Sequence, residues 1–354
     1  MIYFLFLIKF SFSIYIIWVS SKNFDIAASY ISRNLPDGIK GPTINAVASS
    51  FPELIISSLF LFYYSDVVGF SAGYATIVGS AAFNITVIPV IASWIYFKNN
   101  SSNNISINKT VIIQDSLFNL LSILFLGFTF FIGIISLITC IVLMLIYVFY
   151  IYFVFKNRNQ HQVSQNKDFD FFNESEIHQS TSLDIIQLRL FSIFKNKVDN
   201  SSSVIVLISS IFLIAVACHL LTVTCEDLSS ILGVDLFFIS FFIAAIASSI
   251  PDTFLSIYDA RNNKIDDAFS NAFGSNIFDI CIGLGLPLFI YILLNGNIVI
   301  NQTSAFNPFL LIKSISLLFL LSICSSLIFY FGRFSKLKSV LIFIFYLVFI
   351  YFML

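Results

Sequence analysis

Two copies of a short motif place a carboxylate directly after a proline inside an apolar run. Glu53 follows Pro52, and Asp252 follows Pro251. A carboxylate at the centre of a bilayer is costly unless it faces a polar interior or a bound cation. We therefore interpret Glu53 and Asp252 as candidate ligands of a cation inside a membrane.

The same two prolines free a pair of backbone carbonyl groups. Proline has no N–H group, so in a helix the carbonyls of Ala48 and Ala247, four residues earlier, lose their partners. Irregular backbone at this depth is tolerated where it lines a cavity, and its carbonyls can bind cations. Ala48 and Ala247 therefore join the candidate set.

Further oxygen-bearing residues lie three or four positions apart, which places them on shared helix faces. The candidate metal ligands are Glu53, Asp252, Ser49, Ser50, Ser80, Asn84, Ser248, Ser249, Ser275, Asp279, Ala48 and Ala247. Hard cations such as calcium take about six to eight oxygen ligands. The set contains no histidine or cysteine, which disfavours zinc and copper.

The two motifs belong to longer repeats. In both, Ser-Ser-x-Pro-acid is followed by Gly-Ser-x-x-Phe-Asx-Ile, over residues 49–85 and 248–280. Either copy alone could be a helix kink or a close-packing motif, but both together favour a site. Five predicted helices separate the copies, so the second copy is inverted. Transporters with inverted repeats hold their site between the repeats at the membrane midplane.

The composition places these motifs in a membrane protein. The 354 residues are 58% hydrophobic and 10% charged, whereas soluble domains carry about a quarter charged residues. The net charge of −1 gives no indication of nucleic-acid binding. The five cysteines are scattered through apolar runs, which is typical of small buried residues and not of a disulfide framework.

The apolar runs predict an all-α integral membrane fold of about ten transmembrane helices, in two inverted five-helix repeats. Residues 1–155 form the first repeat, 156–203 a polar loop and 204–354 the second repeat. The first apolar run is expected to be a retained helix and not a signal peptide. The expected helices cover about 2 into the twenties, 41–64, 71–97, two spans within 110–155 divided near Gly127 or Gly133, 204–225, 236–259, 268–294, 308–331 and 340 to the end.

The distribution of lysine and arginine predicts the orientation. The loops that follow odd-numbered helices carry these residues, whereas the loops that follow even-numbered helices carry none. Under the positive-inside rule the odd loops, with the loop at 156–203, face the cytosol. Both termini then face the opposite side.

At these residues the chain resembles the cation/calcium exchanger superfamily, of the sodium/calcium exchanger type. The resemblance covers both repeats, and the second, from Ala247 through Pro287, is similar to potassium-dependent and related microbial members. It implies a secondary active antiporter that exchanges calcium and sodium by alternating access, with potassium as a further candidate ion. Glu53 and Asp252 would be the central ligands, and the other candidate residues would complete neighbouring cation sites.

The first repeat departs from the family pattern in three places, one of which is Gly41-Pro42 at the start of its second helix. Ala81 stands where the family usually has Asn, and Thr76 stands where another Asn is common. Asp279 opposite Asn84 resembles the potassium-dependent pattern. The departures bear on ion stoichiometry more than on the central acids.

A proton-coupled exchanger of the same fold, or a transporter of magnesium or potassium, stays open as the alternative. An intramembrane aspartyl protease is disfavoured because Leu286, not an aspartate, follows Gly285, and inverted repeats with broken helices disfavour a channel. We expect no enzyme activity and no cofactor; the expected partners are inorganic cations and the lipid bilayer.

Asp115 is expected to begin a helix at the interface, and Lys9 has no evident partner.

Overall fold

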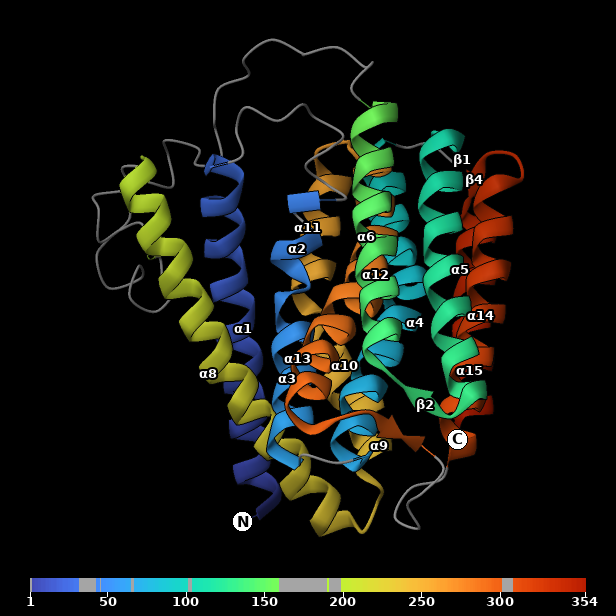
Figure 1. Ribbon diagram of the computed structural model, residues 1–354. Helices are drawn as coiled ribbons and strands as arrows, with labels where there is room; N and C mark the ends of the chain where they lie inside the picture. Colours follow the sequence, from blue (N-terminus) through green and yellow to red (C-terminus); the bar gives the residue numbers. More distant parts are fainter. Residues whose placement is uncertain are drawn as a thin grey trace.

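A computed structural model describes residues 2–31, 43–44, 46–64, 67–100, 104–158, 190, 199–300 and 308–354. The described chain is almost entirely helical, and the expected all-α membrane fold is confirmed (Figure 1). Most of the predicted polar loop at 156–203 lies outside the described residues.

Eight of the described helices are long and apolar enough to cross a membrane. They are α4 (Val67–Asn100), α5 (Lys109–Ile132), α6 (Leu137–Arg158), α8 (Asn200–Leu232), the run α9 to α11 (Leu236–Arg261), the run α12 to α13 (Ile265–Asn295), α14 (Pro308–Tyr330) and α15 (Lys336–Met353). In addition come α1 (Ile2–Ile31) and the broken pair α2 (Ala46–Ser49) and α3 (Phe51–Tyr64). The number of ten membrane spans therefore stays a prediction.

The apolar stretch at 110–155 divides at Gly133, one of the two predicted positions. Gly133 has φ 77°, and its N–H bonds to the carbonyls of Phe130 and Thr129 at the end of α5. This left-handed conformation at a helix end favours glycine. Gly127, the other predicted position, lies inside α5 without a break.

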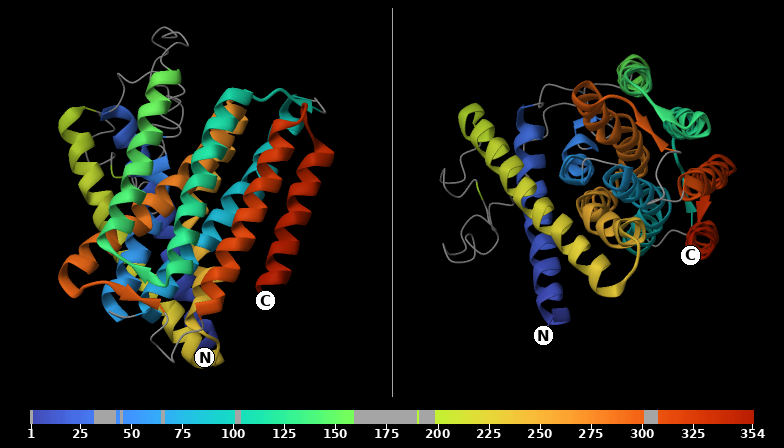
Figure 2. Two further views of the ribbon diagram at one scale, coloured as in Figure 1. Left: turned by 45° about the vertical axis from the view of Figure 1, so that its right-hand side comes forward. Right: turned by 60° about the horizontal axis from the view of Figure 1, so that its bottom comes forward.

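The helices form three groups across the molecule. The right-hand view in Figure 2 shows α1 and α8 together on one side, α2 to α4 and α9 to α13 in the middle, and α5, α6, α14 and α15 on the other side. Both termini lie towards one end, which we call the termini end (Figure 1). The end of α6 and the start of α8 lie at the opposite end, which we call the central-loop end.

Two short β-ladders, which the sequence did not predict, connect the repeats. β1 (Asn104–Ile105) pairs antiparallel with β4 (Phe334–Ser335), and β2 (Ile134–Ile135) pairs antiparallel with β3 (Ile298–Val299). The first ladder lies at the central-loop end and the second at the termini end (Figure 1). Each ladder joins a connection of the first repeat to one of the second, at opposite ends, as expected for two inverted copies.

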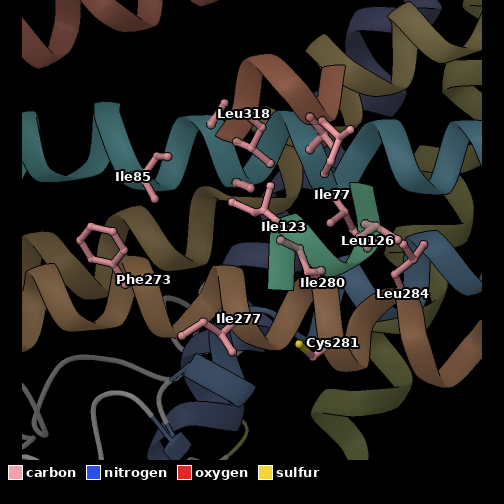
Figure 3. Packing of buried hydrophobic residues seen from close by; sticks show 14 of the residues in the cluster. Ile77, Ile85, Ile123, Leu126, Phe273, Ile277, Ile280, Cys281, Leu284 and Leu318 are labelled. Atoms are coloured by element: carbon pink, nitrogen blue, oxygen red, sulfur yellow. The ribbon is translucent and has the colours of Figure 1, made fainter. Parts of the chain in front are cut away.

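The largest apolar core lies between the middle group and its outer neighbours. Figure 3 labels members of this core: Ile77 and Ile85 of α4, Phe273 and Ile277 of α12, Ile123 and Leu126 of α5, and Leu318 of α14. These residues are fully buried. The opposite faces of α4 and α12 are thereby left to line the centre of the molecule.

The two repeats meet closely at Gly79 of α4. A Cβ atom at this position would collide with the carbonyl oxygen of Phe241 and would lie 2.7 Å from the Cβ of Ala245. Phe241 belongs to η3 (Ser240–Ala244), a π-helical segment between α9 and α10. Glycine at position 79 therefore permits the contact that brings the polar residues of both repeats together.

Candidate cation site

Both proline motifs interrupt their helices, as the sequence predicts. α2 ends and α3 begins around Ser50, and α10 (Ala245–Ser248) gives way to α11 (Ile250–Arg261) at Ser249. Both serines are fully buried. Proline stands four residues after Ala48 and Ala247, so neither carbonyl has a helical N–H donor at that position.

Glu53 is fully buried at the start of α3. Its Oε1 accepts a hydrogen bond from the Ser80 hydroxyl at 3.2 Å, and that hydroxyl lies 2.8 Å from the hydroxyl of Ser249. The Ser248 side chain also interacts with the carboxylate. Oε2 has no hydrogen-bond partner among the described residues. One oxygen of Glu53 is therefore left for a ligand.

Asp252 is fully buried, and each of its oxygens accepts a hydrogen bond. The Ser275 hydroxyl donates to Oδ1 at 2.7 Å, and the Asn84 amide donates to Oδ2 at 3.1 Å. The side chains of Ser49 and Asn271 also interact with this carboxylate. Asp252 thus draws donors from both repeats.

The two repeats make equivalent contacts at this site, except at one pair of positions. Ser80 contacts Glu53 as Ser275 contacts Asp252. Asn84 of the first repeat donates to Asp252 of the second repeat. The residue equivalent to Asn84 in the second repeat is Asp279. An amide is therefore replaced by a third carboxylate in the second repeat.

Asp279 is the least compensated of these acids. It is fully buried at the start of η4 (Asp279–Leu284), a second π-helical segment. Neither of its oxygens has a hydrogen-bond partner within the described chain, and the Ser50 hydroxyl, which also lacks one, approaches it. Glu53 and Asp252 both lie close enough to repel it electrostatically.

The unpartnered atoms of this site are nearly all acceptors. Among the described residues that the sequence indicated, they are Glu53 Oε2, Asn84 Oδ1, both oxygens of Asp279 and the Ser50 hydroxyl. Leaving a buried polar group unpaired is costly, and a cation held by carboxylate, amide and hydroxyl oxygens removes that cost. Hard cations such as calcium and sodium suit such a donor set.

The contacts above connect the ten candidate side chains, and the structure adds two residues that the sequence did not indicate. Asn276 donates its amide to the Ala81 carbonyl at 2.9 Å, and Asn271 lies beside Asp252. Both asparagines are fully buried. The spacing of four between Asn271 and Ser275 is the signal that could have identified Asn271. The serine hydroxyls 49 and 248 also donate within their own helices.

Asp115 and Lys9 both have partners on other helices. Asp115 was expected at an interfacial helix start, which is wrong: it is fully buried, and Ser270 and Tyr150 donate to it at 2.6 and 3.2 Å. The helix begins earlier, with Asn108 as its N-cap. Lys9, which had no evident partner, forms an ion pair of 3.1 Å with Asp227, between α1 and α8.

The sequence matches a known family along nearly its whole length. The family model described as sodium/calcium exchanger protein matches residues 5–156 and 202–354. Among curated relatives, sodium/potassium/calcium exchanger 1 of Bos taurus is 32% identical over 149 residues, which are 42% of this chain and 12% of that protein. The protein of the same name from Gallus gallus is 37% identical over 93 residues, 26% of this chain and 14% of that one. This chain thus matches only a small part of the length of these relatives.

Solved structures share the fold. An H+/Ca2+ exchanger superposes with a TM-score of 0.69 at 16% identity, over 97% of this chain and 81% of that chain. A sodium-calcium exchanger soaked with Na+ superposes with a TM-score of 0.61 at 18% identity, over 98% of both chains.

Proposed function

The chain belongs to the sodium/calcium exchanger protein family, and from this premise we propose that it is a secondary active antiporter that exchanges calcium for sodium by alternating access. One observation carries the proposal. Glu53, Asp252 and Asp279 lie fully buried at the junction of the two repeats, and oxygens of Glu53 and Asp279 have no partner among the described residues. Such oxygens need a counter-charge.

The negative charge of these three buried carboxylates favours exchange of cations over one-way transport. Moving the empty site from one side of a membrane to the other would keep uncompensated carboxylates in a medium of low dielectric constant, which is costly. Bound cations remove that cost in either direction. The protein therefore changes its access with cations bound, and each transport cycle carries cations both ways.

The site geometry supports a division of roles. Glu53 and Asp252 are proposed as the central ligands of calcium and of the exchanged sodium. Asp279 with Ser50 forms an adjoining cation position. The remaining hydroxyl, amide and carbonyl groups complete the coordination; they are Ser49, Ser80, Asn84, Ser248, Ser249, Ser275 and the carbonyls of Ala48 and Ala247.

Potassium is a further proposed ion. The curated relatives cited above are named sodium/potassium/calcium exchangers. The third acid, Asp279, adds a negative charge that a monovalent cation would balance. We propose the adjoining position at Asp279 as the place where potassium would bind.

The protein is a multi-pass membrane protein, and we propose that its central-loop end faces the cytosol. The proposal rests on the lysines and arginines of the odd-numbered loops. The termini would then face the opposite side. The proposed partners are inorganic cations and the lipid bilayer, with no nucleic acid.

A proton-coupled exchanger is the second candidate function. The observation that favours it is Asp279, whose oxygens receive no hydrogen bond from the described protein, because a proton can neutralise such an acid as well as a metal cation can. The fold is shared with a solved H+/Ca2+ exchanger. A transporter of another cation, such as magnesium or potassium, would use the same oxygens.

Calcium uptake into proteoliposomes separates these functions. The purified full-length chain is reconstituted with sodium inside, and radioactive calcium is added outside, with and without potassium. We expect uptake that disappears when the sodium gradient is removed. Uptake that instead follows an imposed proton gradient would establish the second candidate. Absence of calcium uptake under every gradient, in folded protein, would contradict calcium transport.

A further inference from the structure

A line of polar side chains leads away from the cation site along α12. Asp267, Asn271, Ser275 and Asp279 follow one another at intervals of four residues. Residues four apart share a helix face. Ser275 and Asp279 belong to the site described above, so the same face continues through Asn271 and Asp267 towards the central-loop end.

α11 presents a matching line. It runs from Asp252 through Ser256 to Asp259, near the last turn of the helix. The Asn271 amide lies 3.5 Å from the Ser256 hydroxyl, and the side chain of Asn271 also interacts with Asp252. The two polar lines therefore face each other between α11 and α12.

Acids stand at the outer end of this line. Asp267 of α12 and Asp25 of α1 are carboxylates that act electrostatically on Asp259. The exposed Lys264 is a cation that acts on it. The loop between α11 and α12 lies at the central-loop end, because Asn263 accepts a hydrogen bond of 2.7 Å from Asn100 at the end of α4. The line thus runs from this end of the molecule to the cation site.

Outside the cation site, two buried oxygen atoms along the two lines have no hydrogen-bond partner among the described residues. Asp259 is 6% exposed, and its Oδ2 receives no hydrogen bond from the described residues. Asn271 is 0% exposed, and its Oδ1 likewise has none within the described ranges. Apolar packing gives no reason for unpaired oxygens here, whereas a passing cation or its water does.

The first repeat shows that this line is not a by-product of the internal repeat. The positions equivalent to Asp259 and Asp267 are Phe60 and Ala72, which are fully buried in an apolar cluster. The position equivalent to Asn271 is Thr76, whose hydroxyl donates to the Ala72 carbonyl at 3.0 Å. At these three equivalent positions the first repeat therefore carries no acid and no amide.

We propose that Asp259, Asp267 and Asn271 form an entry lane that binds hydrated cations transiently between the central-loop end and the carboxylates of the site. The proposal rests on the proposed function, since the cation is the transported one. A group of acids raises the local concentration of cations around it. A neutral amide deeper in the lane holds the ion weakly enough for it to move on.

The test measures the apparent affinity for calcium on each face separately. Full-length Asp259→Asn and Asp267→Asn variants are reconstituted in vesicles of known orientation. We expect the half-saturating calcium concentration to rise on the order of ten-fold at the central-loop face and to stay unchanged at the termini face. Since these substitutions keep the size of the side chain, we expect the variants to fold.

Asp266→Asn is the matched control. Asp266 precedes Asp267 on the same helix and carries the same charge, but its Oδ1 accepts a hydrogen bond of 3.0 Å from the backbone N–H of Asn108, the N-cap of α5. We expect no change in this variant, whose amide oxygen still accepts the bond. An equal rise in Asp266→Asn would show a general surface-charge effect and would overturn the lane.

Two further results would also overturn it. One is a rise of equal size at both faces, and the other is an unchanged affinity in folded Asp259→Asn and Asp267→Asn. Failure of the proposed function is distinguishable, because the wild-type protein would then move no calcium. In that event the comparison of faces is made with the cation that the wild type does move.

Discussion

At the scale of single residues, the three buried acids are held very differently. Asp252 receives hydrogen bonds from Ser275 and Asn84, whereas Asp279 receives none from the described chain. Donors stabilise a carboxylate whether or not a cation is bound. An acid without donors depends on the cation, so Asp279 should be the acid most sensitive to which ion occupies the site.

The first prediction follows from this difference. Asp279→Asn removes one negative charge and keeps the size of the side chain. We expect the half-saturating concentration of the monovalent coupling cation to rise about ten-fold or more, equal to about 1.4 kcal/mol of binding free energy, and more than that of calcium. Flux assays with each cation varied in turn measure the two values. A larger effect on calcium than on the monovalent cation would be inconsistent with the adjoining position.

The sequence indicated most of these residues but not their partners. The repeat and the proline motifs point to Glu53 and Asp252 because their types and spacing are local properties. The buried position of Asp115 and the ion pair of Lys9 with Asp227 depend on contacts between helices distant in the sequence. No pattern within one helix could have predicted them.

At the scale of elements, two departures from α-helical geometry shape the site. The π-helical segments η3 and η4 lie in the second repeat, and η4 begins at Asp279. Such segments are frequent at functional sites, because the extra residue in the turn changes the direction of the side chains that follow. The sequence predicted the helices but not these segments, since no residue type marks them.

A second prediction concerns the close approach of α4 and η3. In Gly79→Ala the new Cβ would collide with the Phe241 carbonyl, so backbone must shift, and overpacking of this kind costs about 1–3 kcal/mol. We expect a lower thermal unfolding midpoint for the purified protein in detergent. We also expect reduced transport, because the contact joins the two repeats.

Gly127→Ala is the matched control for this substitution. A Cβ at Gly127 would lie 3.6 Å from the nearest atom of Ile315, an ordinary contact, and alanine favours the helix by about 0.5–1 kcal/mol over glycine. The unfolding midpoint should therefore stay level or rise. Equal destabilisation by both substitutions would contradict a special role for Gly79.

At the scale of the whole molecule, the two β-ladders support the inverted arrangement. They join connections of the first repeat to connections of the second, one at each end of the molecule (Figure 1). The order of the helices and the division at Gly133 followed from apolar runs and glycine. The ladders could not be predicted, because two-residue strands carry no periodic signal and form only after the helices pack.

The third prediction concerns orientation in the membrane. Ser164→Cys places a thiol in the predicted central loop, and Asn297→Cys places one in the exposed turn after α13, at the termini end. With Cys324 replaced by serine, the other native cysteines are buried. An impermeant thiol reagent should modify the first variant from the cytosolic side only and the second from the opposite side only. Modification of both from one side would contradict the proposed topology.

The most direct test of the account compares calcium uptake by Glu53→Gln and Asp252→Asn with that of the wild type. Each variant removes one buried charge and keeps the shape of its side chain, while Asp266→Asn controls for loss of an acid elsewhere. With equal amounts of folded protein in the vesicles, we predict that sodium-driven uptake is abolished in the first two and retained in the control. Substantial uptake by either Glu53→Gln or Asp252→Asn would contradict the claim that these carboxylates hold the transported cations.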